Sequence, residues 1–138
     1  MTDQDLLLKK LSFIETCLTQ LRTLTTPNLI DTDVKERRFV EHTLQVALQA
    51  LLDAASHIVS DERLGEPSTN GELFDLLSHA GWLEPKLATT LRAAVGFRNV
   101  LVHGYTEVNL DVVRDVLENR LDDLEAFVTT IRQRLTNA

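Results

Sequence analysis

Arg98 and His103 stand close together in the stretch FRNVLVHGYTEV, residues 97–108, with four residues between them. An arginine stays charged at any ordinary pH and can bind two phosphate oxygens at once, so it stabilises negative charge that builds up on phosphorus. A histidine titrates near neutrality and can remove the proton of a ribose 2′-hydroxyl or protonate a leaving 5′-oxygen. The two residue types therefore suit cleavage of a phosphodiester bond without a metal.

Two further polar side chains belong to the same stretch. Asn99 could orient either basic group by hydrogen bonding, and the hydroxyl of Tyr105 could contact a phosphate or be modified. In a regular helix Arg98 and His103 lie about 140° apart, so a bend at Gly104 or a second subunit would have to bring such groups together. The alternative is structural, because cations at a helix C-terminus complement its partial negative charge. Spacing alone leaves both interpretations open.

Other polar residues could support such a site. Lys35, Arg37 and Arg38 form a basic cluster that could line an RNA-binding rim or be a solvated helix face. Asp53 and His57 lie four residues apart and could form a hydrogen-bonded pair near the site, or an ordinary surface pair. We take Arg37, Arg38, Asp53 and His57 as candidates for RNA contact or for support of the catalytic groups.

No metal site is predicted. The histidines do not show a His-Glu-x-x-His spacing, and the single Cys17 gives no zinc pattern. The glycines are scattered and form no phosphate-binding loop. The sequence therefore predicts a site made of side chains, without a cofactor.

The segments that must position these residues have helical periodicity. Apolar residues recur at spacings of three and four in residues 3–24, and again from Asp33, with Glu36 as the partner of a capping box, to about residue 60. A short helix is predicted in GELFDLLSHA, ended by Gly81. The next helix begins at Pro85 and runs into the polar stretch described above.

A last helix, capped by Asn109, carries an apolar stripe to Leu135. The chain shows no alternating strand pattern of useful length. We therefore predict a single all-α domain over residues 1–138, an antiparallel bundle of four long helices and one short helix.

Composition narrows the classes of function. The formal net charge of −7 weighs against a general polyanion-binding surface, so RNA binding would require a local concentration of positive charge. One cysteine cannot form an internal disulfide, the N-terminus has no cleavable signal pattern, and no apolar run approaches the roughly 18 residues that span a bilayer. We expect a cytoplasmic protein that does not enter a membrane.

The phrase RNVLVHGY is more specific than the spacing of its basic residues. It resembles the R-x4-H-x-Y signature of HEPN-superfamily ribonucleases, in particular the HepT-type toxins encoded beside minimal nucleotidyltransferases. Arg98, Asn99, His103 and Tyr105 stand at the positions of that signature. The segments RRFVEHTLQVALQALLDAASHIVSDE and GELFDLLSHAGWLE, and the closing helix after YTEVNLDVV, resemble the family's successive elements, so the resemblance covers nearly the whole chain.

This resemblance implies an all-α fold that dimerises with two motifs facing a shared cleft, and metal-independent RNA cleavage by Arg98 and His103. It also implies a partner, a minimal nucleotidyltransferase antitoxin that uses ATP to transfer AMP onto Tyr105, while the toxin itself needs no cofactor. A bulky anionic adenylate beside Arg98 would exclude an RNA phosphate by charge and by volume.

Three functions remain open on the sequence. The first is a toxin ribonuclease of this type. The second is a non-catalytic subunit that binds a nucleotide or presents substrate to a nucleotidyltransferase, and the third is a purely structural dimerisation module. The intact signature favours the first, because a binding subunit has no need of a histidine at that position and a structural module leaves the signature unexplained.

Overall fold

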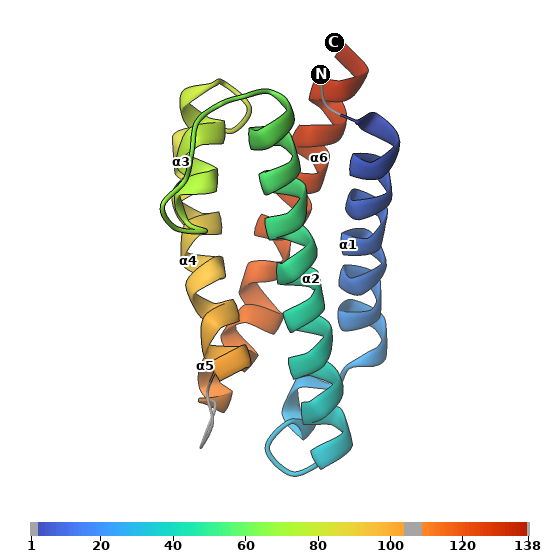
Figure 1. Cartoon of the computed structure of the whole chain (residues 1–138). Helices are drawn as coiled ribbons and strands as arrows, with labels where there is room; N and C mark the ends of the chain where they lie inside the picture. Colours follow the sequence, from blue (N-terminus) through green and yellow to red (C-terminus); the bar gives the residue numbers. More distant parts are fainter. Residues whose placement is uncertain (1–2, 104–108, 138) are drawn as a thin grey trace.

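The chain folds into an elongated bundle of helices (Figure 1). The computed structural model describes residues 3–103 and 109–137, with the main chain alone at Val100, Val102 and His103. Within this part of the chain every regular element is helical. The long helices α1 (Gln4–Leu24), α2 (Val34–Asp61) and α4 (Pro85–His103) run in alternating directions, and the short α3 (Glu72–His79) lies beside the upper half of α4 (Figure 1).

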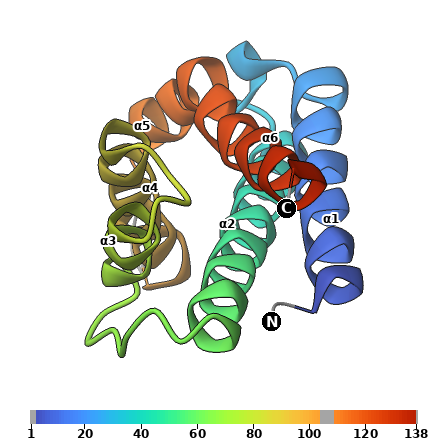
Figure 2. The ribbon, with the colours of Figure 1, turned by 90° about the horizontal axis from the view of Figure 1, so that it is seen from above.

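The fourth long stretch consists of three consecutive segments. These are α5 (Leu110–Asp115), a π-helical turn η2 (Val116–Arg120) and α6 (Leu121–Asn137). Seen from above, α2 lies between α1 and α4, and α6 closes the bundle by contacting both of them (Figure 2). The predicted antiparallel bundle of four long helices and one short helix is confirmed.

The π turn has a cause in the spacing of the buried residues. Val113, Leu117 and Leu121 are all buried and follow one another at intervals of four residues. Over eight residues a regular α-helix would rotate the last of them about 80° away from the first. A π turn holds more residues and takes up this rotation, so all three side chains stay on the core side. The predicted continuous last helix is therefore interrupted.

The start of α2 differs in part from the predicted capping box. The Asp33 carboxylate accepts hydrogen bonds from the N–H groups of Lys35 and Glu36, at 2.9 and 3.3 Å, as an N-cap should. The Glu36 carboxylate accepts from the Thr26 N–H at 2.5 Å instead of returning to Asp33. Glu36 thus braces the turn that precedes α2, which contains the short 3-10 helix η1 (Pro27–Leu29).

The end of α3 follows the prediction. Gly81 has φ +82°, the left-handed conformation that favours glycine, and its N–H donates to the Ser78 carbonyl at 3.0 Å. The Trp82 N–H donates to the Leu77 carbonyl at 2.8 Å. Together these two bonds form a Schellman motif, which stops the helix and turns the chain toward α4.

The core is formed by the predicted apolar stripes. Every residue of the α1 stripe is buried, namely Leu7, Leu11, Ile14, Leu18 and Leu21. Phe74 from α3 and Phe127 from α6 meet edge to face with their ring centroids 6.4 Å apart. In the described part of the chain no helix is both long and apolar enough to cross a membrane.

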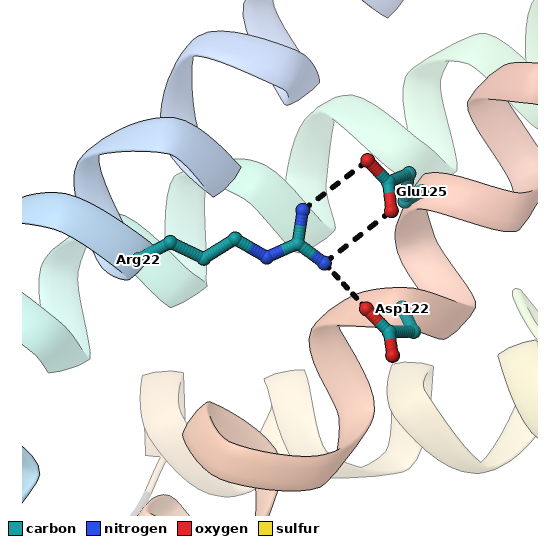
Figure 3. Close-up of polar contacts among 3 residues, drawn as sticks. All are labelled: Arg22, Asp122 and Glu125. Atoms are coloured by element: carbon teal, nitrogen blue, oxygen red, sulfur yellow. Dashed lines mark hydrogen bonds and ion pairs between the residues drawn. The ribbon is translucent and has the colours of Figure 1, made fainter.

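Ion pairs join α1 to α6 on the outside of the bundle. Arg22 on α1 reaches Asp122 at 2.6 Å and Glu125 at 3.2 Å on α6 (Figure 3). A second pair has the arginine on α6 and the carboxylate on α1, where Arg132 contacts Glu15. Each of these pairs is partly exposed, so we expect each to contribute less than about 1 kcal/mol, and their shared effect is to fix how the two helices align.

Candidate active site

Arg98 is held against α2. Its side chain is half-buried, and its Nη2 donates a hydrogen bond to Oε1 of Gln49 at 2.5 Å. Its Nε is buried and has no hydrogen-bond partner among the described residues. The guanidinium is therefore held through Nη2, and its Nε is enclosed without a partner in the described part of the chain.

The helical pattern of α4 explains this placement. Leu91 and Val95 are buried and point into the bundle, and Arg98 follows Val95 by three residues on the same side. Because α2 and α4 pack side by side, the long arginine stem reaches the edge of α2 while its head stays near the surface. Packing of α4 thus places Arg98 at the boundary between core and solvent.

The other signature residues are described to different extents. Asn99 is exposed and lies off the face of α4 that carries Arg98, as the helical spacing predicts. The α-helix continues to His103, whose main chain lies about 7.5 Å beyond Arg98 along the helix axis. The side chain of His103 and the whole of Tyr105 lie outside what the structure describes, so their predicted roles stay predictions.

The basic cluster lies at the same end of the bundle as the end of α4. Lys35, Arg37 and Arg38 begin α2, which runs antiparallel to α4, so both helix ends are at the bottom of the molecule (Figure 1). Lys35 and Arg38 are exposed and Arg37 is half-buried. None of the ion pairs found among residues 3–103 and 109–137 involves any of these three residues. Within this part of the chain the positive charge of the cluster is therefore not compensated by direct pairing.

Of the two interpretations that the sequence left open for Asp53 and His57, a mutual hydrogen bond is excluded, because each residue has a different partner. Asp53 accepts from Nε2 of Gln49 at 2.8 Å and pairs with Lys10 of α1 at 3.5 Å. Nε2 of His57 lies 3.1 Å from Oδ2 of Asp61, one turn further along α2. The alignment of these atoms falls short of a hydrogen bond, so the contact is an ion pair when His57 is protonated. Asp53 is connected to Arg98 through Gln49, whereas His57 is not.

Gln49 and Lys10 are functional candidates that the sequence analysis missed. A glutamine in the middle of an amphipathic helix is an ordinary boundary residue, and the only local signal was its position four residues before Asp53, a spacing at which Gln–Asp pairs form. The contact to Arg98 spans 49 residues of sequence and could be found only from the packing of α4 on α2.

The single cysteine, Cys17, is not part of this site. Cys17 is buried in the core, and burial raises the pKa of its thiol. Among the residues whose positions are described, no three His, Cys, Asp or Glu side chains gather in a way that could hold a metal ion. The candidate site thus consists of Arg98 with its α2 partners, the end of α4 and the basic cluster.

Comparison with known proteins points to one family. Residues 14–131 match the family model described as ribonuclease HepT-like. The mRNA nuclease HepT of Shewanella oneidensis is 30% identical over 129 residues, which is 93% of this chain and 97% of that protein. The tRNA nuclease HepT of Aphanizomenon flos-aquae is 31% identical over 101 residues, 73% of this chain and 69% of that protein.

A solved structure supports the same assignment. The tri-AMPylated Shewanella oneidensis HEPN toxin, solved in complex with MNT antitoxin, superposes with a TM-score of 0.87 at 30% identity, covering 96% of this chain and 99% of that one. The fold, the family match and the signature at residues 98–105 agree, and the resemblance inferred from the sequence is confirmed. This chain belongs to the HepT-like family of HEPN ribonucleases.

Proposed function

We propose that this chain is the toxin of a HEPN and minimal nucleotidyltransferase pair, and that it cleaves RNA without a metal in a cleft shared by two copies. Arg98 binds the scissile phosphate, and His103 transfers the protons of the reaction. Asn99, four residues before His103 on the same helix, orients the histidine. The observation that carries the proposal is the half-buried side chain of Arg98, whose guanidinium is held by a neutral amide, five residues before His103 on the same helix.

The substrate is RNA of the host cell, which places the protein in the cytoplasm. The relatives named above are an mRNA nuclease and a tRNA nuclease, so mRNA and tRNA are the two candidate substrates. Arg37 and Arg38 contact the RNA backbone beyond the scissile phosphate. Two observations support this role: both arginines begin α2 at the end of the bundle where α4 ends, and neither belongs to an ion pair among the described residues. Phosphate contacts by such residues give affinity that does not depend on the RNA sequence.

The partner is a nucleotidyltransferase antitoxin that uses ATP to place AMP on Tyr105, and the toxin itself holds no cofactor. The support is the tri-AMPylated state of the similar Shewanella oneidensis toxin and the tyrosine at the last signature position of this chain. Each added adenylate brings a negatively charged phosphate close in sequence to Arg98, where it competes with the phosphate of RNA.

A cleavage assay tests the activity. Purified protein is incubated with bulk tRNA and with an mRNA transcript, in EDTA, beside the variants Arg98→Ala and His103→Ala. We expect cleavage by the wild type and a loss of at least about a hundredfold in both variants, because each removes a group that acts on the reacting phosphate. Arg92→Ala is the matched control, since Arg92 lies on the same helix but pairs with Asp75 on α3. Cleavage by a well-folded His103→Ala protein would remove this histidine from the mechanism, and inactivity of the wild type would favour a nucleotide-binding subunit.

A mass measurement tests the partner. The protein is incubated with ATP and the nucleotidyltransferase encoded beside it, and tryptic peptides covering Tyr105 are analysed. Addition of one or more AMP units to the wild type, and none to Tyr105→Phe, is expected.

Sedimentation of the unmodified protein as a dimer would support the shared cleft, and a monomer that cleaves RNA would contradict it.

A further inference from the structure

A line of polar contacts runs behind Arg98 across three helices. Nη2 of Arg98 on α4 donates to Oε1 of Gln49 on α2 at 2.5 Å, and Nε2 of Gln49 donates to Oδ1 of Asp53 at 2.8 Å. Oδ2 of Asp53 accepts from Nζ of Lys10 on α1 at 3.5 Å. The arginine is thus the first member of a continuous chain of four side chains.

The two neighbours of Gln49 enforce a single orientation of its amide. A guanidinium only donates hydrogen bonds and a carboxylate only accepts them, whereas a glutamine amide has one end of each kind. If the amide turned over, its NH2 would face the N–H groups of Arg98 and its oxygen would face the Asp53 carboxylate. Both contacts would then be lost together, so Asp53 determines that Gln49 presents an oxygen to Arg98.

None of the ion pairs among the described residues involves Arg98. Other arginines of the bundle pair with carboxylates, as Arg22, Arg92 and Arg132 do. Arg98 instead meets a neutral oxygen, and the carboxylate that follows Gln49 in this line, that of Asp53, is itself paired with Lys10. The guanidinium is therefore fixed in place while its full charge stays available to an anion.

We propose that Gln49, oriented by Asp53, is a positioning residue that holds Arg98 for the phosphate of the substrate without neutralising it. The inference rests on the proposed function, in which Arg98 binds the scissile phosphate. A side chain that is already ordered before substrate arrives loses less freedom in the transition state, so its electrostatic effect is larger.

Two substitutions at Gln49 separate this role from a merely structural one. Gln49→Leu removes the acceptor, and we expect kcat for RNA cleavage to fall about tenfold with KM changed less than about threefold, because ordering of Arg98 is lost. Gln49→Glu keeps the shape and an acceptor oxygen but adds a carboxylate that competes with the phosphate, so we expect a loss of about a hundredfold. If Gln49 only supported the fold, the isosteric Glu variant would be the milder of the two, and that order would overturn the proposal.

A double variant tests whether Asp53 acts through Gln49. Asp53→Leu alone is expected to lower kcat about fivefold to tenfold, and Gln49→Leu/Asp53→Leu is expected to be no slower than Gln49→Leu. Additive losses would show that Asp53 acts independently and would overturn this part of the proposal. Gln20→Leu, which changes a half-buried glutamine of α1, serves as the control with unchanged kcat.

The same series distinguishes failure of this inference from failure of the proposed function. If Arg98→Ala abolishes cleavage while both Gln49 variants cleave like the wild type, Arg98 is catalytic and the positioning role is wrong. If Arg98→Ala cleaves like the wild type, the proposed function itself fails. Circular dichroism and urea unfolding of every variant confirm that the compared proteins are folded.

Discussion

The guanidinium carbon of Arg134 lies 4.2 Å from the centre of the Trp82 ring. Nη1 of the same arginine donates to the Gly81 carbonyl at 3.1 Å. The last turns of α6 are therefore fastened to the turn between α3 and α4 by a cation–π contact and a hydrogen bond, just before the start of α4, whereas Arg98 lies in the last two turns of that helix.

Arg134→Gln should lower the free energy of unfolding by about 1 kcal/mol, because both contacts are lost and an exposed cation–π contact contributes about 0.5–1 kcal/mol. Urea unfolding followed by Trp82 fluorescence measures the change. Arg120→Gln is the control, since Arg120 makes a partly exposed ion pair with Asp115 at 3.6 Å, and its effect should stay within about 0.5 kcal/mol. Equal effects of the two substitutions would argue against the Trp82 contact.

Two glycines should respond to alanine with opposite signs. Gly81→Ala should destabilise the protein by about 1–2 kcal/mol, because φ at this residue is +82° although no atom lies within 4 Å of the added Cβ. Gly96 lies inside α4 and also has open space around a Cβ, so Gly96→Ala should stabilise by up to about 1 kcal/mol through helix propensity. Thermal unfolding of both variants tests this, and destabilisation by both would contradict it.

Cys17 should react slowly in the native protein. Its side chain is 2% exposed, and burial raises the pKa of the thiol, so less thiolate is present at pH 8 than in a free cysteine. Reaction with a thiol-specific disulfide reagent should become complete in seconds only after unfolding in urea. The raised folded pKa also means that stability declines as the pH rises from the ordinary thiol range through the folded pKa. Fast labelling in buffer would contradict burial of this residue.

Arg38→Gln should weaken RNA binding several-fold and reduce the dependence of the affinity on salt by about 0.7 in the logarithmic slope, the value for one lost phosphate contact on a single strand. Arg63→Gln is the matched control, because Arg63 is also exposed but lies just beyond the opposite end of α2. A catalytically inactive His103→Ala background allows binding to be measured without cleavage. Similar losses in both variants would indicate a general charge effect rather than a local rim.

Periodicity and end signals were sufficient to predict most of the fold. The stripe of α1, the Asp33 and Asn109 caps and the Gly81 stop depend on residues close together in sequence, and each is found where it was expected. The π turn in the last helix was missed because the pattern was interpreted with a single helical period. The successive four-residue intervals among Val113, Leu117 and Leu121 were the signal that could have revealed it.

The candidate site was predictable only in part. The sequence offers His57 two carboxylates at equal spacing, Asp53 one turn before it and Asp61 one turn after it. In the structure Lys10 of α1 and the Gln49 amide contact Asp53, whereas His57 lies against Asp61, which also accepts from the Asp3 N–H. Partners that come from another helix depend on packing, and no local pattern encodes them.

The alternating direction of the helices also determines where the chain can be attached to something else. The start of α1 and the end of α6 lie together at the top of the bundle, whereas α4 ends at the bottom (Figure 1). A tag, a fluorescent protein or an immobilising linker joined at either of these helix ends would extend away from Arg98 and the basic cluster. Protein tethered to a sensor surface by the start of α1 or by the end of α6 would present the proposed RNA-binding end to solution in both cases.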